Sequence, residues 1–325
     1  MSAAPARRLA MMLSMAGAAC ALSCSNYGPT AATESATWSA GTAAHTVVVG
    51  SLTRTFLVHV PSRRRLNTAG LTIPWPLVIV LHGSSGDAAS IEHQSGMDSL
   101  ADAQRFLVAY PNGTGGAFGL YPSDWNAGSC CGGANRDNID DLGFITSLIA
   151  VVNGHVAMDA HRVYVAGFSS GGYMAYHAGC QLATTVAAIG VVSGSLADDS
   201  CVPAKPVPLF AVHGTDDTDV PYDQDAPPPP GPVPNIADTL PPSLRFWSST
   251  NGCAAKAAKG TLKTVTADVA LSHMTSCTVA DVDFYSIRGG THGWPGGPDA
   301  PGAQPPMNEI KATVLMWQFF IAHIR

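Results

Sequence analysis

The sequence predicts an α/β fold in which a mostly parallel central sheet is flanked by helices on both faces. The first observation is a series of short, continuous aliphatic runs such as Leu77–Leu81, which are typical of strands buried on both sides. The second is that helical periodicities separate several of these runs. The third is size, because 325 residues with 46% hydrophobic content can bury a large core, which excludes a disordered or fibrous chain.

The chain is expected to open with a hairpin, in which Val47–Val49 and Arg54–Val60 pair across a turn at Gly50-Ser51. The buried strands predicted after this hairpin are Leu77–Leu81, Phe106–Tyr110, Arg162–Ala166, Ala188–Val192, Val207–Val212 and Asp283–Ile287. The apolar residues that predict one face of a helix are Leu142, Ile145, Leu148, Ile149 and Val152, and, near the end of the chain, Ile310, Val314, Trp317, Ile321 and Ile324. A further helical pattern covers Tyr173–Cys180, and the Pro-rich stretch Ala226–Pro242 is predicted to be a surface loop.

Composition restricts the class of partner. The chain has 17 Lys and Arg against 23 Asp and Glu, a net charge of −6, and its cations do not cluster beyond Arg63-Arg64-Arg65. This excludes a dedicated nucleic-acid surface, because binding of phosphates needs a basic footprint. Charged residues make up 12% of the chain, about half of the ~25% typical of soluble domains. With 33 Gly and 24 Pro, the chain is predicted to be a loop-rich globular protein with a weakly charged surface.

The first residues predict export. Arg7 and Arg8 precede the apolar run Leu9–Leu22, which is too short to span a bilayer, and no other run is long enough to be a transmembrane segment. Residues 1–24 are therefore expected to be a signal peptide, with a lipidated Cys20 or Cys24 of a cell-envelope lipoprotein as the alternative. Residues 25–44 are expected to form a flexible spacer, and residues 45–325 a single domain.

Six of the eight cysteines lie outside this export segment, an even number that is typical of disulfide-bonded exported proteins. The candidates for local bridges are Cys180 with Cys201 and Cys253 with Cys277. Cys130 and Cys131 either bridge each other or pair elsewhere, and the sequence leaves both possibilities open. Neither a Cys-x-x-Cys nor a His-Glu-x-x-His motif occurs, so no metal site is predicted, and no cofactor is expected.

A Gly-x-Ser-x-Gly pattern lies between the strand at Arg162–Ala166 and the helix at Tyr173–Cys180. In this strand–turn–helix context the pattern predicts a nucleophile elbow, with Ser169 as the nucleophile. The alternative is an ordinary glycine-rich turn or a phosphate loop, but a phosphate loop would require a lysine that this turn lacks. The loop after Leu77–Leu81 begins His82-Gly83-Ser84, and the backbone N–H groups of Ser84 and Ser170 are predicted to form an oxyanion hole.

A serine nucleophile needs a base, and the base needs an acid that orients it. Of the three histidines beyond residue 213, His292 follows a strand and is surrounded by glycines, whereas His273 and His323 lack that context. His213 is interpreted as a structural residue at a strand end. The three aspartates that follow the strand Val207–Val212 compete for the role of acid: Asp216, Asp217 and Asp219.

The motifs that occur together are Leu81-His82-Gly83, Trp125-Asn126-Ala127-Gly128-Ser129-Cys130-Cys131-Gly132, Gly167-Phe168-Ser169-Ser170-Gly171-Gly172, His213-Gly214-Thr215 to Val220-Pro221-Tyr222, Asn251-Gly252-Cys253 and His292-Gly293-Trp294-Pro295-Gly296-Gly297. In this order they resemble the secreted polyhydroxybutyrate-depolymerase-like esterases, which overlap with the type D feruloyl esterases of carbohydrate esterase family one. The resemblance covers residues 45–325 and implies an α/β-hydrolase fold. It selects Asp217 as the acid of a Ser169–Asp217–His292 triad. It also implies that Trp125 and Trp294 lie near the acyl or alcohol pocket, the alternative being two core aromatics.

The resemblance implies an exported serine carboxylesterase that acts through an acyl-enzyme on polyesters of polyhydroxyalkanoate type, or on feruloylated or acetylated plant polysaccharides. The alternatives are a peptidase on the same fold and a catalytically silent protein that binds polysaccharide or the cell envelope. The expected partner is the ester substrate, and the protein is expected to be a monomer. The insertion Ala226–Pro242 is expected to form a rim or lid near the site. The apparent lack of a polymer-binding module shifts the expectation toward soluble oligoesters or polysaccharide esters.

Overall fold

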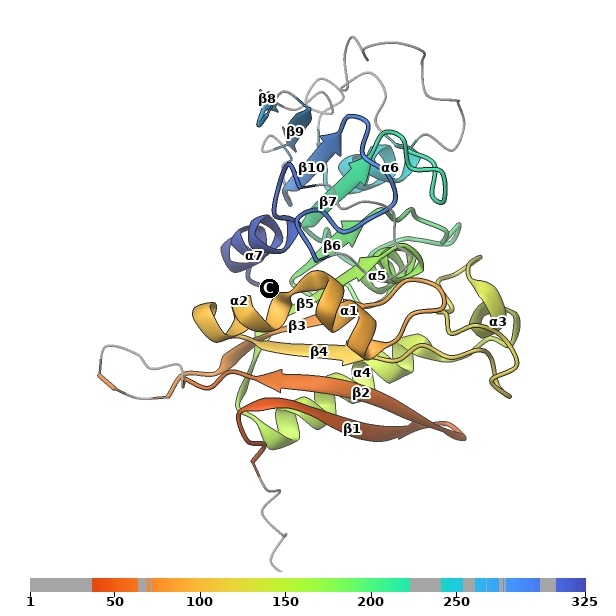
Figure 1. Cartoon of the computed structure of the whole chain (residues 1–325), viewed down its shortest axis with the longest axis vertical. Helices are drawn as coiled ribbons and strands as arrows, with labels where there is room; N and C mark the ends of the chain where they lie inside the picture. The colour runs from red at the N-terminus through yellow and green to blue at the C-terminus, as the bar shows by residue number, and fades with distance from the viewer. Residues whose placement is uncertain are drawn as a thin grey trace, which may run out of the picture. The chain divides into compact units, whose positions relative to one another are not determined.

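A sheet of ten strands lies at the centre of the part of the chain that the structure describes (Figure 1). This computed structural model describes residues 37–63, 69–70, 72–222, 241–253, 261–266, 268–274, 277, 279–298 and 308–325. The strands are β1 (Gly41–Val49), β2 (Leu52–Val60), β3 (Trp75–Leu81), β4 (Leu107–Pro111), β5 (Met158–Phe168), β6 (Ala188–Val192), β7 (Leu209–Gly214), β8 (Thr261–Thr264), β9 (Val269–Met274) and β10 (Val282–Ile287). Their order in the sheet is β1-β2-β4-β3-β5-β6-β7-β10-β9-β8.

The strands from β4 to β10 in this order are parallel, whereas β1 with β2 and β9 with β8 form antiparallel pairs at the two edges. Every residue of β3, β4, β6 and β7 is buried. Continuous aliphatic runs form these strands because helices cover both faces of the sheet. Ala36–Arg325 form one compact unit.

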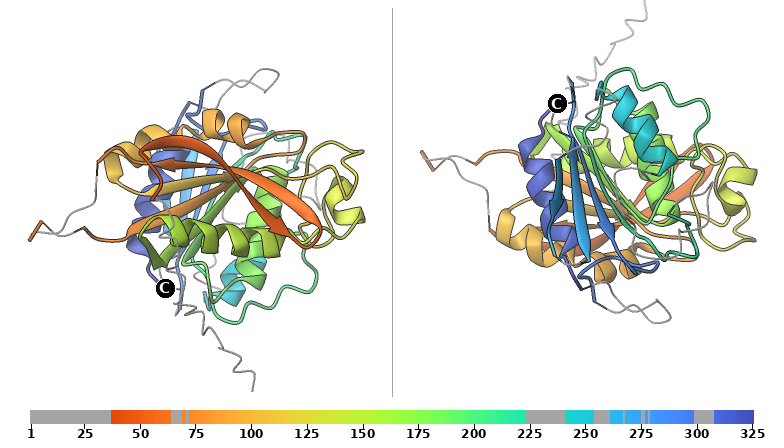
Figure 2. Two further views of the ribbon diagram at one scale, coloured as in Figure 1. Left: turned by 90° about the horizontal axis from the view of Figure 1, so that it is seen from below. Right: turned by 90° about the horizontal axis from the view of Figure 1, so that it is seen from above.

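Helices lie on both faces of the sheet (Figure 2). The helices are α1 (Ala88–Ser95), α2 (Met97–Gln104), α3 (Gly132–Arg136), α4 (Asp141–His155), α5 (Ser170–Gln181), α6 (Pro242–Thr250) and α7 (Ala312–Ala322). α4, α5 and α6 build one core, to which Leu148 and Trp247 contribute, and α1, α2 and α7 build the other, to which Ile91 and Phe320 contribute. The predicted α/β class, with its mostly parallel sheet between helices, is confirmed.

The predicted hairpin, its turn at Gly50-Ser51 and all six buried strands are confirmed, with ends that differ by a few residues. The spacer boundary is wrong, because Gly41–Ala44 form the start of β1. These residues are exposed on an edge strand, so no apolar pattern marks them as a strand. The antiparallel pair β8 and β9 was not predicted either. Residues 1–36, which include the expected signal peptide, lie outside the described residues.

The terminal helix is confirmed as α7, but its predicted apolar face is wrong in part. Ile321 and Ile324 are 48% and 55% exposed, whereas the helix buries Met316, Trp317 and Phe320. In the Pro-rich stretch, residues 226–240 lie outside the described residues, while Pro242 is the first residue of α6. Proline fits there because the first helical turn does not use its missing N–H.

Three disulfides join the six cysteines of the described region. They are Cys130–Cys131, Cys180–Cys201 and Cys253–Cys277. Both predicted local bridges are therefore confirmed, and the open pairing of the adjacent cysteines is a vicinal bridge. Among the described helices, none has the length and apolar character needed to cross a bilayer.

A polar cluster joins the β1–β2 hairpin to α1 and α2. Asp98 accepts hydrogen bonds from the hydroxyl groups of Thr42 (2.7 Å) and Tyr110 (2.6 Å), and Nδ1 of His59 lies 3.1 Å from the same carboxylate. Burial alone would raise the pKa of Asp98, but these contacts outweigh it and lower that pKa to about 2. Burial, together with the hydrogen bond to Asp98 and its negative charge, raises the pKa of Glu92 to about 7.

We expect Glu92→Gln to remove part of the pH dependence of stability. The pKa of Glu92, about 7 in the folded chain, exceeds its usual 4.5, so its proton stabilises the fold at low pH. This contribution is lost as the pH rises toward 7, whereas Gln keeps a neutral donor beside Asp98. Urea denaturation at about pH 5 and about pH 8 measures the change in the free energy of unfolding. Glu309 is exposed, and the variant Glu309→Gln is the control. The expectation would be contradicted if the free energy of unfolding fell equally between the lower and the higher pH in wild type and in Glu92→Gln.

Candidate active site

The predicted catalytic segments lie at the carboxyl ends of parallel strands. Ser169 follows β5 directly, Ser84 follows β3, Asp217 follows β7 and His292 follows β10. These strands belong to a run of successive parallel neighbours, β3, β5, β6, β7 and β10. Their carboxyl ends therefore lie along one side of the sheet, the edge at which the parallel strands end. Open α/β sheets bind their ligands at this edge.

Ser169 occupies a strained turn between β5 and α5. Its backbone has φ 54° and ψ −122°, a region that L-residues rarely adopt. A Cβ atom added at Gly167 would overlap with the backbone of Gly171, and one added at Gly171 would overlap with the carbonyl oxygen of Leu81. The two glycines of the motif are therefore required by the close approach of the backbone. The backbone N–H of Ser169 donates to the carbonyl oxygen of Val192 at 3.0 Å, which ties the turn to the end of β6.

Asp217 and His292 are in direct contact. Nδ1 of His292 lies 2.8 Å from Oδ2 of Asp217, whose side chain is 0% exposed. The backbone N–H groups of Asp219 and Val220 donate to Oδ1 of Asp217 at 3.0 and 2.9 Å. Burial alone would raise the pKa of Asp217, but hydrogen bonds, first those from His213 and His292, hold it well below its usual range. Because an ionised carboxylate only accepts, Nδ1 of His292 carries the proton of this hydrogen bond, and in the neutral imidazole Nε2 then has the lone pair that can accept a proton.

The nucleophile turn and the histidine loop contact each other. The ring of Phe168, the residue before Ser169, lies 4.8 Å from the ring of His292 between centroids. Ser193, at the end of β6, donates from its hydroxyl group to the carbonyl oxygen of Gly293 at 3.4 Å. Phe168 in the nucleophile turn and Ser193 after the neighbouring strand β6 therefore both support the loop that carries His292.

His213 contacts the candidate acid, a role that the sequence did not predict. Its Nε2 lies 2.8 Å from the carbonyl oxygen of Val220 and 3.3 Å from Oδ2 of Asp217. A carbonyl oxygen only accepts, so Nε2 of His213 carries a proton that is shared between the two acceptors. The sequence signal is the short spacing of His213 and Asp217, which lie four residues apart at the end of β7.

The loop after β3 lies against the nucleophile turn, because a Cβ atom added at Gly83 would lie 3.1 Å from Cβ of Ser169. His82 fixes this loop. The backbone N–H of Gly113 donates to Nε2 of His82 at 2.9 Å, so Nδ1 carries the proton and donates to the carbonyl oxygen of Gly83 at 2.7 Å. Burial lowers the pKa of His82, which favours this neutral form.

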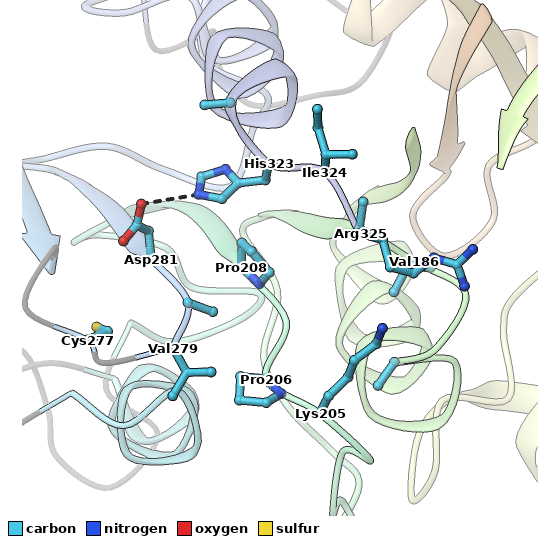
Figure 3. A pocket seen from close by; sticks show the side chains of 14 residues that line it. Val186, Lys205, Pro206, Pro208, Cys277, Val279, Asp281, His323, Ile324 and Arg325 are labelled. Atoms are coloured by element: carbon cyan, nitrogen blue, oxygen red, sulfur yellow. Dashed lines mark hydrogen bonds and ion pairs between the residues drawn. The ribbon is translucent and has the colours of Figure 1, made fainter. Parts of the chain in front are cut away.

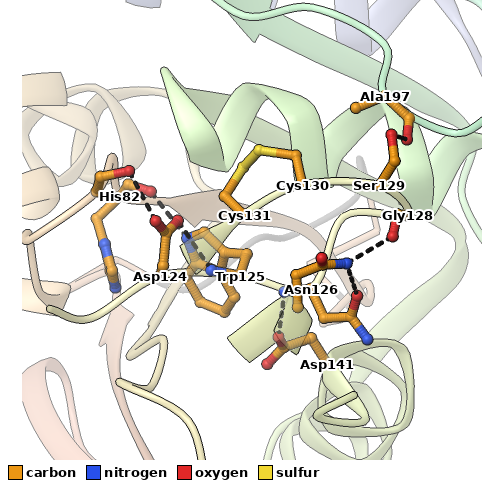
Figure 4. The surroundings of a disulfide bond; sticks show 12 residues. His82, Asp124, Trp125, Asn126, Gly128, Ser129, Cys130, Cys131, Asp141 and Ala197 are labelled. Atoms are coloured by element: carbon orange, nitrogen blue, oxygen red, sulfur yellow. Dashed lines mark hydrogen bonds between the residues drawn. A yellow bond between two sulfur atoms is a disulfide. The ribbon is translucent and has the colours of Figure 1, made fainter. Parts of the chain in front are cut away.

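A second loop, residues 123–132, supports the first (Figure 4). Nε1 of Trp125 donates to the carbonyl oxygen of His82 at 2.8 Å. The hydroxyl group of Ser84 donates to Oδ2 of Asp124 at 2.9 Å, so its side chain faces this loop. Trp125 and Asp124 thus hold both ends of the His82-Gly83-Ser84 segment. The sequence did not predict these contacts, which join segments about forty residues apart.

The vicinal disulfide Cys130–Cys131 lies in this second loop, and both cysteines are half-buried. The backbone N–H of Cys131 donates to the carbonyl oxygen of Trp125 at 2.7 Å. The hydroxyl group of Ser129 donates to the carbonyl oxygen of Ala197 at 2.7 Å, in the segment after β6. The second loop therefore connects the segments that lie after β3 and after β6.

The two tryptophans that were expected near the substrate are both buried. Trp125 is 0% exposed and Trp294 is 2% exposed. Nε1 of Trp294 donates to Oγ1 of Thr313 at 2.9 Å, and its ring belongs to the core beneath α7. Neither indole presents surface to a substrate in this structure, and both correspond to the alternative of core aromatics. Trp125 contacts the site through His82, by the hydrogen bond from Nε1 to its carbonyl oxygen and by a tilted ring contact at 4.9 Å between centroids.

The other two candidate histidines, His273 and His323, lie at the opposite edge of the sheet, where the parallel strands begin. His273 pairs in register with Asp283 at the start of β10, so a strand does contain it, contrary to the expectation from sequence. A pocket of about 410 Å³ lies at the same edge, where His323 is 3.2 Å from Asp281 (Figure 3). Most of its lining residues precede β6, β7 or β10, and the others lie at the end of α7 and after it. The candidate catalytic residues Ser169, Asp217 and His292 instead follow β5, β7 and β10. This pocket is therefore separate from the candidate active site.

The structure offers no cluster of three or more His, Cys, Asp or Glu side chains that could hold a metal ion within the described ranges. The Asp217–His292 pair and the strained serine turn are two features that serine nucleophiles use, an acid that orients a histidine and a serine at a strand-to-helix turn.

Comparisons with known proteins agree with this chemistry. Residues 66–206 match the family described as "Esterase PHB depolymerase". Feruloyl esterase B of Piromyces equi is 32% identical over 190 residues, which are 55% of this chain and 33% of that protein. Poly(3-hydroxybutyrate) depolymerase of Ralstonia pickettii is 33% identical over 129 residues, which are 36% of this chain and 25% of that protein. The matched region thus spans a third or less of both relatives.

A solved structure supports the fold. The acetyl xylan esterase from Aspergillus awamori aligns with a TM-score of 0.51 and 16% identity, over 77% of this chain and 94% of that chain. At this identity the likeness concerns the fold alone, which is the α/β-hydrolase fold that the sequence motifs imply.

Proposed function

We propose that this chain is an esterase of the family of the polyhydroxybutyrate depolymerases, and that it hydrolyses carboxylic esters with Ser169 as the nucleophile. The observation that carries the proposal is the contact of His292 with the buried carboxylate of Asp217, at the same edge of the sheet as the strained Ser169 turn. The family match and the esterase relatives support the same reaction class.

In the proposed mechanism, Oγ of Ser169 attacks the ester carbonyl carbon while Nε2 of His292 accepts its proton. Asp217 fixes the imidazole through Nδ1 and stabilises the cation that forms. The backbone N–H groups of Ser84 and Ser170 donate to the oxyanion, and loss of one such donor typically costs about 2.7–4 kcal/mol. His292 then protonates the leaving alcohol, and water releases the acyl group by the reverse sequence of steps.

The substrates that we propose are polyesters of polyhydroxyalkanoate type, or feruloyl and acetyl esters of plant polysaccharides. Relatives and family bear names from both classes, and the chain is similar to both. We also propose that the protein is exported, with residues 1–24 as its signal peptide, and that it acts as a monomer. The three disulfides support an oxidising compartment.

Covalent labelling tests the reaction class. A fluorophosphonate probe should modify the purified protein, and mass spectrometry of its peptides should locate the adduct on Ser169. The labelled protein should lose its activity on p-nitrophenyl butyrate. The rates of hydrolysis of methyl ferulate, acetylated xylan and polyhydroxybutyrate particles are then compared to rank the substrate classes. A protein that resists labelling would be the silent binding protein, and faster cleavage of a chromogenic dipeptide than of any ester would indicate a peptidase.

A further inference from the structure

An exposed apolar loop stands beside the candidate active site. In the loop of residues 116–122, Phe118 is 83% exposed, Leu120 is 74% exposed and Tyr121 is 45% exposed. Single exposed apolar side chains are common, but three within four residues form a patch, which usually marks an interaction site. No charged residue occurs between Asn112 and Asp124.

The loop is an ordered structure that displays these side chains outward. Its base is closed by the paired backbones of Thr114 and Asp124, which exchange hydrogen bonds of 3.0 and 3.1 Å. Tyr121 donates from its backbone N–H to the carbonyl oxygen of Gly115 at 3.1 Å, and Ala117 donates to the carboxylate of Asp137 at 3.0 Å. These hydrogen bonds hold the backbone in a fixed shape, so the exposure of Phe118 and Leu120 is a property of the folded loop.

The base of this loop is continuous with the oxyanion segment. Gly113 donates to His82, and Asp124 accepts from Ser84, whose backbone N–H is a proposed oxyanion donor. At no more than about 3.6 Å per residue, the chain from Thr114 to Phe118 spans at most about 14 Å. Phe118 and Leu120 therefore lie no more than about 14 Å from the loop base that contacts His82 and Ser84, and a long polymer chain can contact both.

We infer that the 116–122 loop is an adsorption surface for a water-insoluble aliphatic polyester, an inference that rests on the proposed esterase function. Phe118 and Leu120 have no hydrogen-bonding group with which to recognise sugar hydroxyls. The guanidinium of Arg136 lies 3.8 Å from the ring centroid of Tyr121 and covers one face of the ring, which a sugar would otherwise stack on. Arg136 is itself paired with Asp137 at 2.7 Å. The partner that fits this loop is the apolar, weakly charged surface of an aliphatic polyester, because the hydrophobic effect drives the burial of Phe118 and Leu120 against such a surface.

The test measures adsorption separately from catalysis. All proteins carry Ser169→Ala, and their binding to polyhydroxybutyrate particles is measured by depletion from solution. Adding Phe118→Ser and Leu120→Ser should weaken the binding constant by at least about tenfold, since burial of one such side chain is worth that factor or more. The matched control carries Val279→Ser and Ile324→Ser, which are 62% and 55% exposed at the opposite edge of the sheet, and it should bind as the parent does.

In the catalytically intact protein, Phe118→Ser with Leu120→Ser should leave hydrolysis of p-nitrophenyl acetate unchanged and slow the hydrolysis of the particles. A failure of the proposed function would appear in the soluble ester, whereas a failure of this inference would appear only in adsorption. Unchanged adsorption, or an equal loss in the control, overturns the inference. A loss of adsorption to feruloylated arabinoxylan alone also overturns it, because that result would assign the loop to polysaccharide binding. A change from dimer to monomer in the loop variant would assign the surface to a second copy and overturns it as well.

Discussion

Ser169→Ala is expected to lower kcat on p-nitrophenyl esters by about 10⁶-fold, as removal of the nucleophile does in serine hydrolases. Without Oγ there is no atom to form the acyl-enzyme, and the pair of His292 and Asp217 has no proton to accept. The residual rate should come only from substrate binding and the oxyanion donors. Alanine leaves the backbone of the turn in place, so KM should change little. Initial rates with an active-site-titrated wild type measure the effect.

Ser170→Ala is the matched control for this variant. Ser170 is proposed to act through its backbone N–H, and its hydroxyl oxygen is buried without a hydrogen-bond partner among the described residues. Removing that hydroxyl group should therefore leave kcat within a few-fold of wild type and cost little stability. If Ser170→Ala lost as much activity as Ser169→Ala, or if Ser169→Ala remained active, Ser169 would not be the nucleophile.

The central strands could be predicted from the sequence because their signal is local. β3, β4, β6 and β7 are buried on both faces, so each appears as an unbroken aliphatic run. The edge strand β1 begins with the exposed residues Gly41–Ala44, which carry no such signal. Nearly every residue of α7 is apolar, so its periodicity could not select the face that tertiary packing buries.

The candidate site could be predicted in part for a similar reason. The glycines that the Ser169 turn requires lie within five residues of one another, so they form a local sequence signal even though Gly171 makes its close contact with the distant Leu81. The contact of Asp217 with His292 joins positions 75 residues apart, and the sequence selected Asp217 only through the family resemblance. The role of Trp125 could not be predicted, because a buried indole that donates to a backbone carbonyl and one that lines a pocket have the same sequence signal.

Asp217→Asn is expected to lower kcat by about 10⁴-fold, which is the effect that the same change has in other serine hydrolases. The carboxylate accepts the proton of Nδ1 of His292 at 2.8 Å. An amide nitrogen in that place would donate instead, so Nδ1 would become the acceptor and Nε2 would carry the proton. His292 could then no longer take the proton of Ser169. The amide oxygen can still accept from the backbone N–H groups of Asp219 and Val220, so the fold should persist, as circular dichroism can verify.

Asp216→Asn separates this effect from a general loss of charge in the loop after β7. Asp216 is exposed, and its carboxylate accepts from the hydroxyl group of Thr215 at 2.9 Å. Its substitution should change kcat by less than about threefold, because exposed charges contribute little to a buried pair. The comparison is decisive because both changes remove one negative charge from adjacent positions. A larger loss in Asp216→Asn than in Asp217→Asn would assign the acid to Asp216, and equal losses would mean that the charge of the loop matters rather than the hydrogen bond to His292.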